Sequence, residues 1–221
     1  MTYFTEDFTC FFKELAKNNH KDWFHAQKKR YETSIKKPFE QFVGDMISHI
    51  QKYDTELQIE PKDCILRINR DIRFSKDKSP YNLHYTAFIS KGGRKDKSIP
   101  GMFLRFSPET IGIMGGCFGP SKEQLHKIRT SIHKNPSTFK KLIDNAEFVK
   151  KFGEIRGETM KRIPKEWIDA CNQEPLIKNK QFYFVGEEAP TLLTNPSLIE
   201  EMMNYWKTMQ PVNEYLSKVI R

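Results

Sequence analysis

Apolar residues recur every three to four positions along the first quarter of the chain. Phe8, Phe11, Phe12 and Leu15 follow this spacing, which predicts an amphipathic helix that ends near Asn18-Asn19. A second helix is expected after it, with Asn19 as its cap, and Pro38 is placed to begin a third. The third has an unbroken apolar stripe formed by Phe39, Phe42, Val43, Met46, Ile47 and Ile50. We therefore expect residues 1–55 to be helical.

The pattern changes between residues 60 and 119 to short runs that are β-branched or aromatic. Such runs occur at residues 64–69, 85–90, 102–107 and 110–114, each bounded by turn residues, and they predict strands. The connections that contain Gly92-Gly93 and Pro108-Glu109 are too short for crossover helices. The last strands of this main sheet should therefore pair antiparallel.

Helical spacing returns from residue 120 to residue 221, with one interruption. Ser121 stands three residues before Gln124, which is the spacing of a capping box. Residues 181–185 predict a short additional strand, and Pro211 is expected to kink or break the final helix. Helices, then a sheet, then helices predict one α+β domain over residues 1–221, with a mostly antiparallel central sheet flanked by N-terminal and C-terminal helices.

Composition narrows the class of protein. The 221 residues include 17 Phe, 8 Tyr and 3 Trp, enough for a sizeable core, and carry a net charge of +9 that favours anionic partners. No apolar run approaches the roughly 18 residues of a membrane helix, and the start does not resemble a signal peptide. We expect a cytoplasmic protein without a membrane partner, and the oligomeric state stays open.

The four cysteines, at positions 10, 64, 117 and 171, are too far apart for a metal site. We expect free thiols in a reducing compartment, no metal and no cofactor. Cys117 lies in a glycine-rich turn and is the one to test for reactivity, although a buried, inert thiol is the favoured interpretation.

The most highly charged stretch covers residues 67–81, called the basic segment below. It holds five cationic side chains and two carboxylates, so its local charge is 5 − 2 = +3. If residues 65–73 are extended, Asp71 can hold one strand arginine while another binds a phosphate or carboxylate. The expected ligand-binding residues are Arg67, Arg70, Arg73, Ser75, Lys76, Lys78 and Tyr81. The alternative is a structural ion-pair network that fixes a long loop onto the sheet.

A second candidate is the turn at residues 115–122, which stands between a predicted strand and a helix start. Backbone amides at such a position favour anions, and the residues concerned are Gly115, Gly116, Gly119 and Ser121. The turn matches neither a Walker loop nor G-x-G-x-x-G, and ordinary turn chemistry is the favoured interpretation.

Candidates for catalysis are Tyr81, His84 and Asp71. His84 follows the basic segment and has the chemistry of an acid or base near neutral pH, although an exposed or hydrogen-bonded histidine is favoured. The rings of Phe74, Tyr81 and Tyr85, interleaved with basic residues, suit phosphate contacts plus base stacking. Phe74 itself is predicted to belong to the core.

The run from Arg70 to Tyr81, Arg-Asp-x-Arg-Phe-Ser-Lys-Asp-Lys-Ser-Pro-Tyr, resembles the hallmark of a family of bacterial and fungal proteins, domain of unknown function 2461. Residues 18–24 with Tyr31 and Pro38, the Gly115-Gly116 turn through Gly119, and residues 161–164 are similar to the same family. Glu166-Trp167 departs from the glycine-aromatic pair expected there. The resemblance covers essentially the whole chain and implies no assigned activity.

Three functions remain open. The first is a binder or enzyme for a phosphorylated or carboxylated small molecule, bound in a pocket formed by residues 70–81. There Arg70 and Arg73 would clamp the anion, Lys76 and Lys78 would add charge, Asp71 would orient an arginine, and Tyr81 or His84 would transfer a proton. The second is a module that binds nucleic acid weakly on the same surface, and the third is a scaffold without ligand. Converging charges indicate a pocket, whereas charges spread along a surface indicate nucleic acid.

Overall fold

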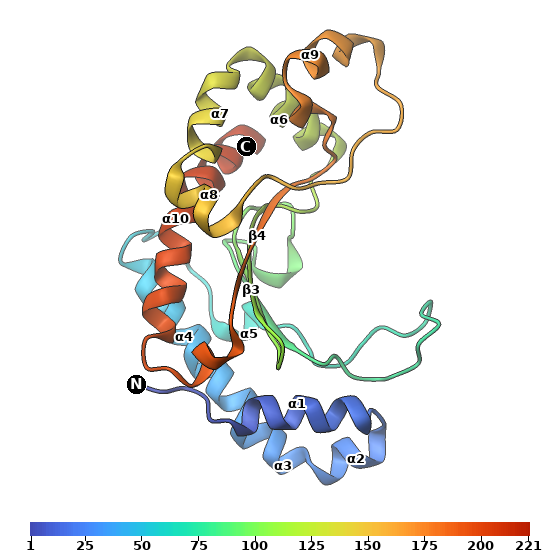
Figure 1. Cartoon of the computed structure of the whole chain (residues 1–221), viewed down its shortest axis with the longest axis vertical. Helices are drawn as coiled ribbons and strands as arrows, with labels where there is room; N and C mark the ends of the chain where they lie inside the picture. Colours follow the sequence, from blue (N-terminus) through green and yellow to red (C-terminus); the bar gives the residue numbers. More distant parts are fainter.

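The computed structural model describes residues Met1–Arg221 and has an α+β architecture (Figure 1). Its four strands lie in the order β1-β2-β3-β4, and every neighbouring pair is antiparallel. They are β1 (Tyr85–Ile89), β2 (Met102–Phe106), β3 (Ile111–Cys117) and β4 (Phe182–Glu188). Helices from both ends of the chain flank this sheet, which confirms the predicted fold class.

The N-terminal helices follow the predicted apolar spacing. They are α1 (Asp7–Lys17), α2 (Lys21–Ala26), α3 (Lys28–Arg30), a π-helical stretch (Tyr31–Lys36) and α4 (Lys37–Gln51). The whole predicted stripe of α4 is buried. The predicted cap of α2 is wrong, because the side chain of His20, not Asn19, accepts from the backbone N–H of Trp23. Asn19 makes a different contact, described below.

The C-terminal helices are α6 (Lys122–Lys134), α7 (Pro136–Ile143), α8 (Ala146–Phe152), α9 (Ile168–Gln173) and α10 (Leu198–Ile220). The capping box of Ser121 and Gln124 is present at the start of α6. Of the two effects predicted for Pro211, a kink or a break, the break is wrong, because α10 continues through this residue. Met209, Val212 and Leu216 are buried around that proline, and this packing offsets the hydrogen bond that proline removes.

Residues 64–69 do not form the predicted strand. Cys64 ends the short helix α5 (Pro61–Cys64), and the chain then makes two isolated bridges, Ile65 to Ala87 and Asn69 to Tyr81. The N–H of Leu66 donates to the main-chain oxygen of Thr86 at 2.9 Å. The segment follows the edge of β1 only briefly because it then leaves the sheet as the basic segment.

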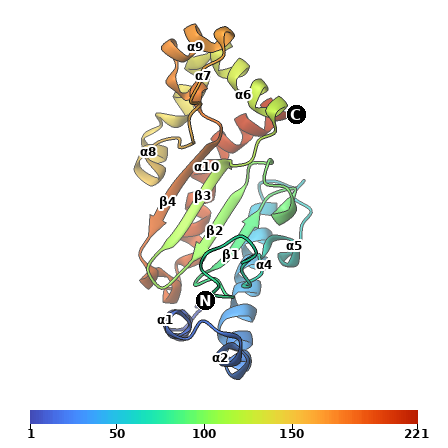
Figure 2. The same cartoon turned by 90° about the vertical axis from the view of Figure 1, so that its right-hand side faces the viewer.

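The two faces of the sheet differ. Alternate residues such as Ala87, Leu104 and Ile113 are fully buried against the helices, among them α4 and α10. Figures 1 and 2 show these helices on one side of the sheet and no helix over the other side. No helix combines the length and apolar character needed to cross a bilayer.

Candidate functional site

The uncovered face of the sheet carries an apolar row where a solvated face is normally polar. The strand register aligns Phe88, Phe103, Met114 and Val185 across the four strands. None of these side chains belongs to the hydrophobic core cluster or packs against it. Phe88 is only 8% exposed, whereas Phe103, Met114 and Val185 are half-buried, so the row is partly accessible. Because monomeric proteins rarely leave a contiguous apolar surface uncovered without a use for it, this face is the strongest candidate for a binding surface.

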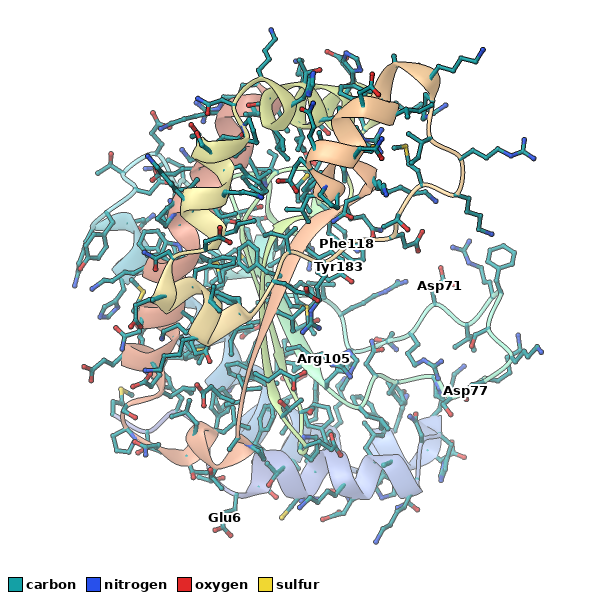
Figure 3. All side chains as sticks on the ribbon, turned by 45° about the horizontal axis from the view of Figure 1, so that its top comes forward. Glu6, Asp71, Asp77, Arg105, Phe118 and Tyr183 are labelled. Carbon is teal, nitrogen blue, oxygen red and sulfur yellow. The ribbon has the colours of Figure 1, made fainter.

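A second pair of rings extends the apolar row toward the end of β3. Phe118, which is 55% exposed, lies edge-on to Tyr183 with ring centroids 5.3 Å apart. Figure 3 shows both rings on the same side of the sheet as Arg105. Arg105 is exposed on β2, one row away from the aromatic residues, opposite Thr86 on β1 and Gly112 on β3. The face thus combines aromatic rings with a cation.

A hollow of about 200 Å³ lies over this face. Its lining contains Leu66 at the base of the basic segment and Gly115, Gly116 and Phe118 from the glycine-rich turn. The glycine-rich turn therefore borders the hollow, whereas the basic segment only begins beside it, after Leu66. Its remaining lining residues are Phe88, Arg94, Lys97, Gly101, Phe103, Met114 and Tyr183.

The basic segment projects from the sheet, and its two carboxylates neutralise two of its arginines. Arg70 donates to Asp77, to the main-chain oxygen of Ser79 (3.0 Å) and to Ser75 Oγ (3.4 Å). Hydrogen bonds from Ser79 and from Arg70 lower the pKa of Asp77 to about 2. These bonds brace the segment internally, so Arg70 and Ser75 have a structural contact in place of a ligand.

Arg73 makes the other ion pair. Its Nε and Nη2 donate to Asp71 at 3.0 and 2.7 Å, and both side chains are exposed. Lys78 Nζ donates to the main-chain oxygen of Ile72 at 3.0 Å. Arg67 and Lys76 are exposed and make no ion pair or hydrogen bond through their side chains. The cations that have partners thus use separate groups within the segment, and none of the five lines the hollow over the sheet.

Phe74 is 95% exposed at the outer part of the basic segment, so its predicted place in the core is wrong. The segment extends away from the sheet, and the nearest cation, Arg73, lies 5.9 Å from the centroid of its ring. Periodicity could not show this, because the segment has no regular secondary structure.

Tyr81 lies inside the molecule, at the other end of the basic segment. Its ring stacks on Phe24 at 4.0 Å between centroids, and burial raises its pKa. Its main chain makes two hydrogen bonds with Asn19: the N–H of Tyr81 donates to Oδ1 (3.1 Å), and Nδ2 donates to the oxygen of Tyr81 (2.9 Å). Tyr81 therefore anchors the segment to the N-terminal helices.

His84 is half-buried just before β1. Burial, followed by the charge of Arg105, lowers its pKa to about 4. The imidazole is thus neutral near pH 7, with Arg105 supplying the positive charge nearby.

The glycine-rich turn uses its amides within the protein. Gly116 has a φ of +90°, and a Cβ there would collide with the carbonyl oxygen of Phe182. Its N–H donates to Asn213 Oδ1 at 2.8 Å, and the N–H of Gly119 donates to the main-chain oxygen of Lys97 at 3.3 Å. The side chain of Ser121 caps α6.

The Cys117 thiol is fully buried and donates to the oxygen of Ser98 at 3.0 Å. Burial raises its pKa to about 12, so it has little thiolate at neutral pH. No three His, Cys, Asp or Glu side chains lie close enough together to bind a metal ion.

The aromatic row was missed at the sequence level, although a signal for it existed. The runs at residues 85–90 and 102–107 place Phe88 and Phe103 out of step with their core-facing neighbours. A strand that is apolar on both faces, in an antiparallel sheet, indicates either burial on both sides or a binding surface.

A family model described as "Conserved hypothetical protein (DUF2461)" matches residues 7–215. The comparisons with curated proteins and with solved structures found no match.

Proposed function

The chain belongs to the DUF2461 family of conserved hypothetical proteins, and because that description carries no activity, we propose from the geometry that the chain binds single-stranded nucleic acid on the uncovered face of its sheet. The observation that supports this most is the row of aromatic and apolar side chains outside the core, Phe88, Phe103, Met114 and Val185, with Phe118 and Tyr183 beside it. Phe118 is 55% exposed, and Phe103 and Tyr183 are half-buried. Accessible rings stack with bases of any sequence.

Cations lie on two sides of this row of aromatic and apolar side chains. The basic segment lies on one side, and the connection between α8 and α9, with Arg156, Lys161, Arg162 and Lys165, lies on the other (Figure 1). Arg156 bridges to Tyr183 at the edge of β4, which places the second group next to the aromatic face. Phosphates on either side of a stacked base would meet these cations.

The spread of the charges favours a polymer over a small anion. Arg70 and Arg73 are paired with Asp77 and Asp71, while the cations without acidic partners, such as Arg67, Arg105 and Arg162, stand on separate elements. An enzyme pocket would need these groups to converge.

A small anionic ligand is the second candidate, and one feature favours it. The hollow of about 200 Å³ offers Phe88 and Phe103 for a ring and Arg94 with Lys97 for an anion. A mononucleotide bound there would need no polymer. Competition between mononucleotides and oligonucleotides separates the two candidates.

Fluorescence anisotropy of a labelled single-stranded oligonucleotide of about 12 nucleotides, a length within the range of known single-strand sites, tests the proposal. Phe103→Ala and Tyr183→Ala should each weaken binding about 5-fold to 150-fold, the equivalent of one lost base stack. Val149→Ala removes an apolar side chain that is 47% exposed on α8, outside this face, and is the control. Equal affinity of all three variants would refute the proposal, and full competition by a mononucleotide would replace the polymer with the small ligand.

Salt dependence tests the role of the cations. The double variant Lys161→Ala/Arg162→Ala should reduce the slope of log affinity against log salt by roughly 1.4, since each phosphate contact on a single strand contributes about 0.7. Lys141→Ala/Lys150→Ala makes the same change of charge on α7 and α8 and should leave the slope unchanged.

A further inference from the structure

A second and larger hollow is a groove at the other side of the β1–β2 connection. It has a volume of about 1050 Å³ and lies between the end of α4, the second half of α10 and residues 89–101. Gly101 lines both this groove and the hollow over the uncovered face. The groove contains none of the residues assigned to nucleic-acid binding above.

Ser90, in the lining of the groove, has the only buried side-chain polar atom without a hydrogen-bond partner in the protein. The residue is 4% exposed. A buried hydroxyl without a partner is costly, and native proteins contain few of them. Because the oxygen has less than 1 Å² of accessible surface, the Ser90 side chain must turn toward the groove before a bound molecule can satisfy it.

The other polar groups deep in the groove are satisfied. Asp96 Oδ1 accepts from the N–H and Oγ of Ser98 at 2.9 and 2.6 Å. Gln124 Nε2 donates to Ser98 Oγ at 3.3 Å, and Asn213 Nδ2 donates to the oxygen of Gly101 at 3.3 Å. Ser90 is the exception within an otherwise complete network.

Aromatic rings and charged side chains of both signs make up the rest of the lining: the cations are Lys91, Lys207, Lys218 and Arg221, and the carboxylates are Asp54, Asp96 and Glu214. The rings of Tyr53 and Trp206 lie 5.7 Å apart, and Lys207 Nζ lies 5.1 Å from the centroid of Tyr53. Lys91 is paired with Asp54 (3.4 Å) and Glu56 (2.6 Å). Lys207 and Lys218 make no ion pair, so these two ammonium groups can meet an anion without breaking a salt bridge.

We propose that this groove is a separate site for an organic anion with an aromatic body, such as an aromatic carboxylate or a phosphate monoester. The body packs against Tyr53 and Trp206, the anionic group meets Lys207 and Lys218, and a polar atom of the ligand bonds to Ser90. The volume is that of a small-molecule site.

Two probes that differ by one charge test the proposal. The probe 8-anilino-1-naphthalenesulfonate carries the anion, whereas N-phenyl-1-naphthylamine has the same rings without it. We expect one sulfonate probe to bind per chain, with energy transfer from tryptophan that falls in Trp206→Phe and persists in Trp23→Phe and Trp167→Phe. The neutral probe should bind more weakly. Equal binding of both probes would overturn the anionic part of the proposal.

The variants separate binding from folding. Lys207→Ala/Lys218→Ala should weaken binding of the sulfonate probe, and Lys141→Ala/Lys150→Ala should not. Ser90→Ala should weaken binding about 2-fold to 10-fold, the effect of one neutral hydrogen bond, without lowering the melting temperature, because the hydroxyl has no protein partner to lose.

Phe103→Ala shows which hollow the probe occupies. Loss of probe binding in Phe103→Ala, with unchanged binding in Ser90→Ala and Lys207→Ala/Lys218→Ala, would place the probe on the uncovered face and overturn the assignment to the groove. The reverse pattern supports the groove.

Discussion

The link between Asn19 and Tyr81 holds the basic segment to the N-terminal helices, and its removal has a calculable cost. Asn19→Ala deletes two hydrogen bonds to the main chain of Tyr81, 2.9 and 3.1 Å long, across 62 residues of sequence. Each such bond contributes about 0.5–1.5 kcal/mol, so the loss in the free energy of unfolding should be about 1–3 kcal/mol. For a chain of this size that lowers the melting temperature by about 2–4 °C per kcal/mol.

Urea denaturation followed by circular dichroism measures this loss. Asn18→Ala is the matched control, because its side chain makes one exposed bond, to the main-chain oxygen of Glu14 at 3.0 Å. That variant should cost less than about 1 kcal/mol. Asn19→Asp should fall between them, since it keeps the acceptor for the N–H of Tyr81 and loses the donor.

Hydrogen exchange gives an independent reading of the same link. The N–H of Arg70, which donates to the oxygen of Pro80 at 2.9 Å, should exchange faster in Asn19→Ala, because the segment is then held at one end only. Equal stability of Asn19→Ala and Asn18→Ala, with unchanged exchange at Arg70, would refute the anchoring role.

Three further predictions concern single residues. Phe74→Ala should change the free energy of unfolding by no more than about 0.5 kcal/mol, because the ring is 95% exposed. The same variant should weaken binding of single-stranded nucleic acid. A loss of stability with normal binding would contradict this prediction. Gly116→Ala should lower the free energy of unfolding by at least about 1–3 kcal/mol, since it combines a φ of +90° with a collision at Phe182, and denaturation by urea measures it. The pKa of His84 is about 4 in the fold, below the 6.5 of a free histidine, so between these pH values the unfolded chain binds one proton more than the folded chain. The free energy of unfolding should therefore decline as pH falls from about 6.5 to 4, and it should decline less in His84→Gln. An imidazole of His84 that titrates near 6.5 by NMR would contradict this prediction.

The sequence alone was sufficient to predict features that depend only on residues within one helix or strand. The stripe of α4, from Phe39 to Ile50, is buried as its spacing predicts. The capping box at Ser121 needs only residues within four positions of each other. Such features depend on local geometry, which the order of residues encodes directly.

Features that depend on distant partners could not be predicted in the same way. Asn19 had the right residue type for a helix cap, but its amide bonds to Tyr81, 62 residues away. Asp71 does hold Arg73, but in an exposed pair, because the segment leaves the sheet where an extended strand was expected. The alternation of residues in β1 and β2 defines two faces, and only the tertiary arrangement decides which of them the helices cover.

Asn213 and Gly101 form a partition between the two hollows. Asn213 joins the N–H of Gly116, at the hollow over the uncovered face, to the oxygen of Gly101, which borders both hollows. A Cβ at position 101 would lie 2.5 Å from the oxygen of Ile89 and from the Cβ of Ser90, so a residue larger than glycine does not fit between the two hollows. A molecule that displaces Gly101 from one side changes the shape of the other side, and thermodynamic linkage makes that influence reciprocal, with the same factor in both affinities.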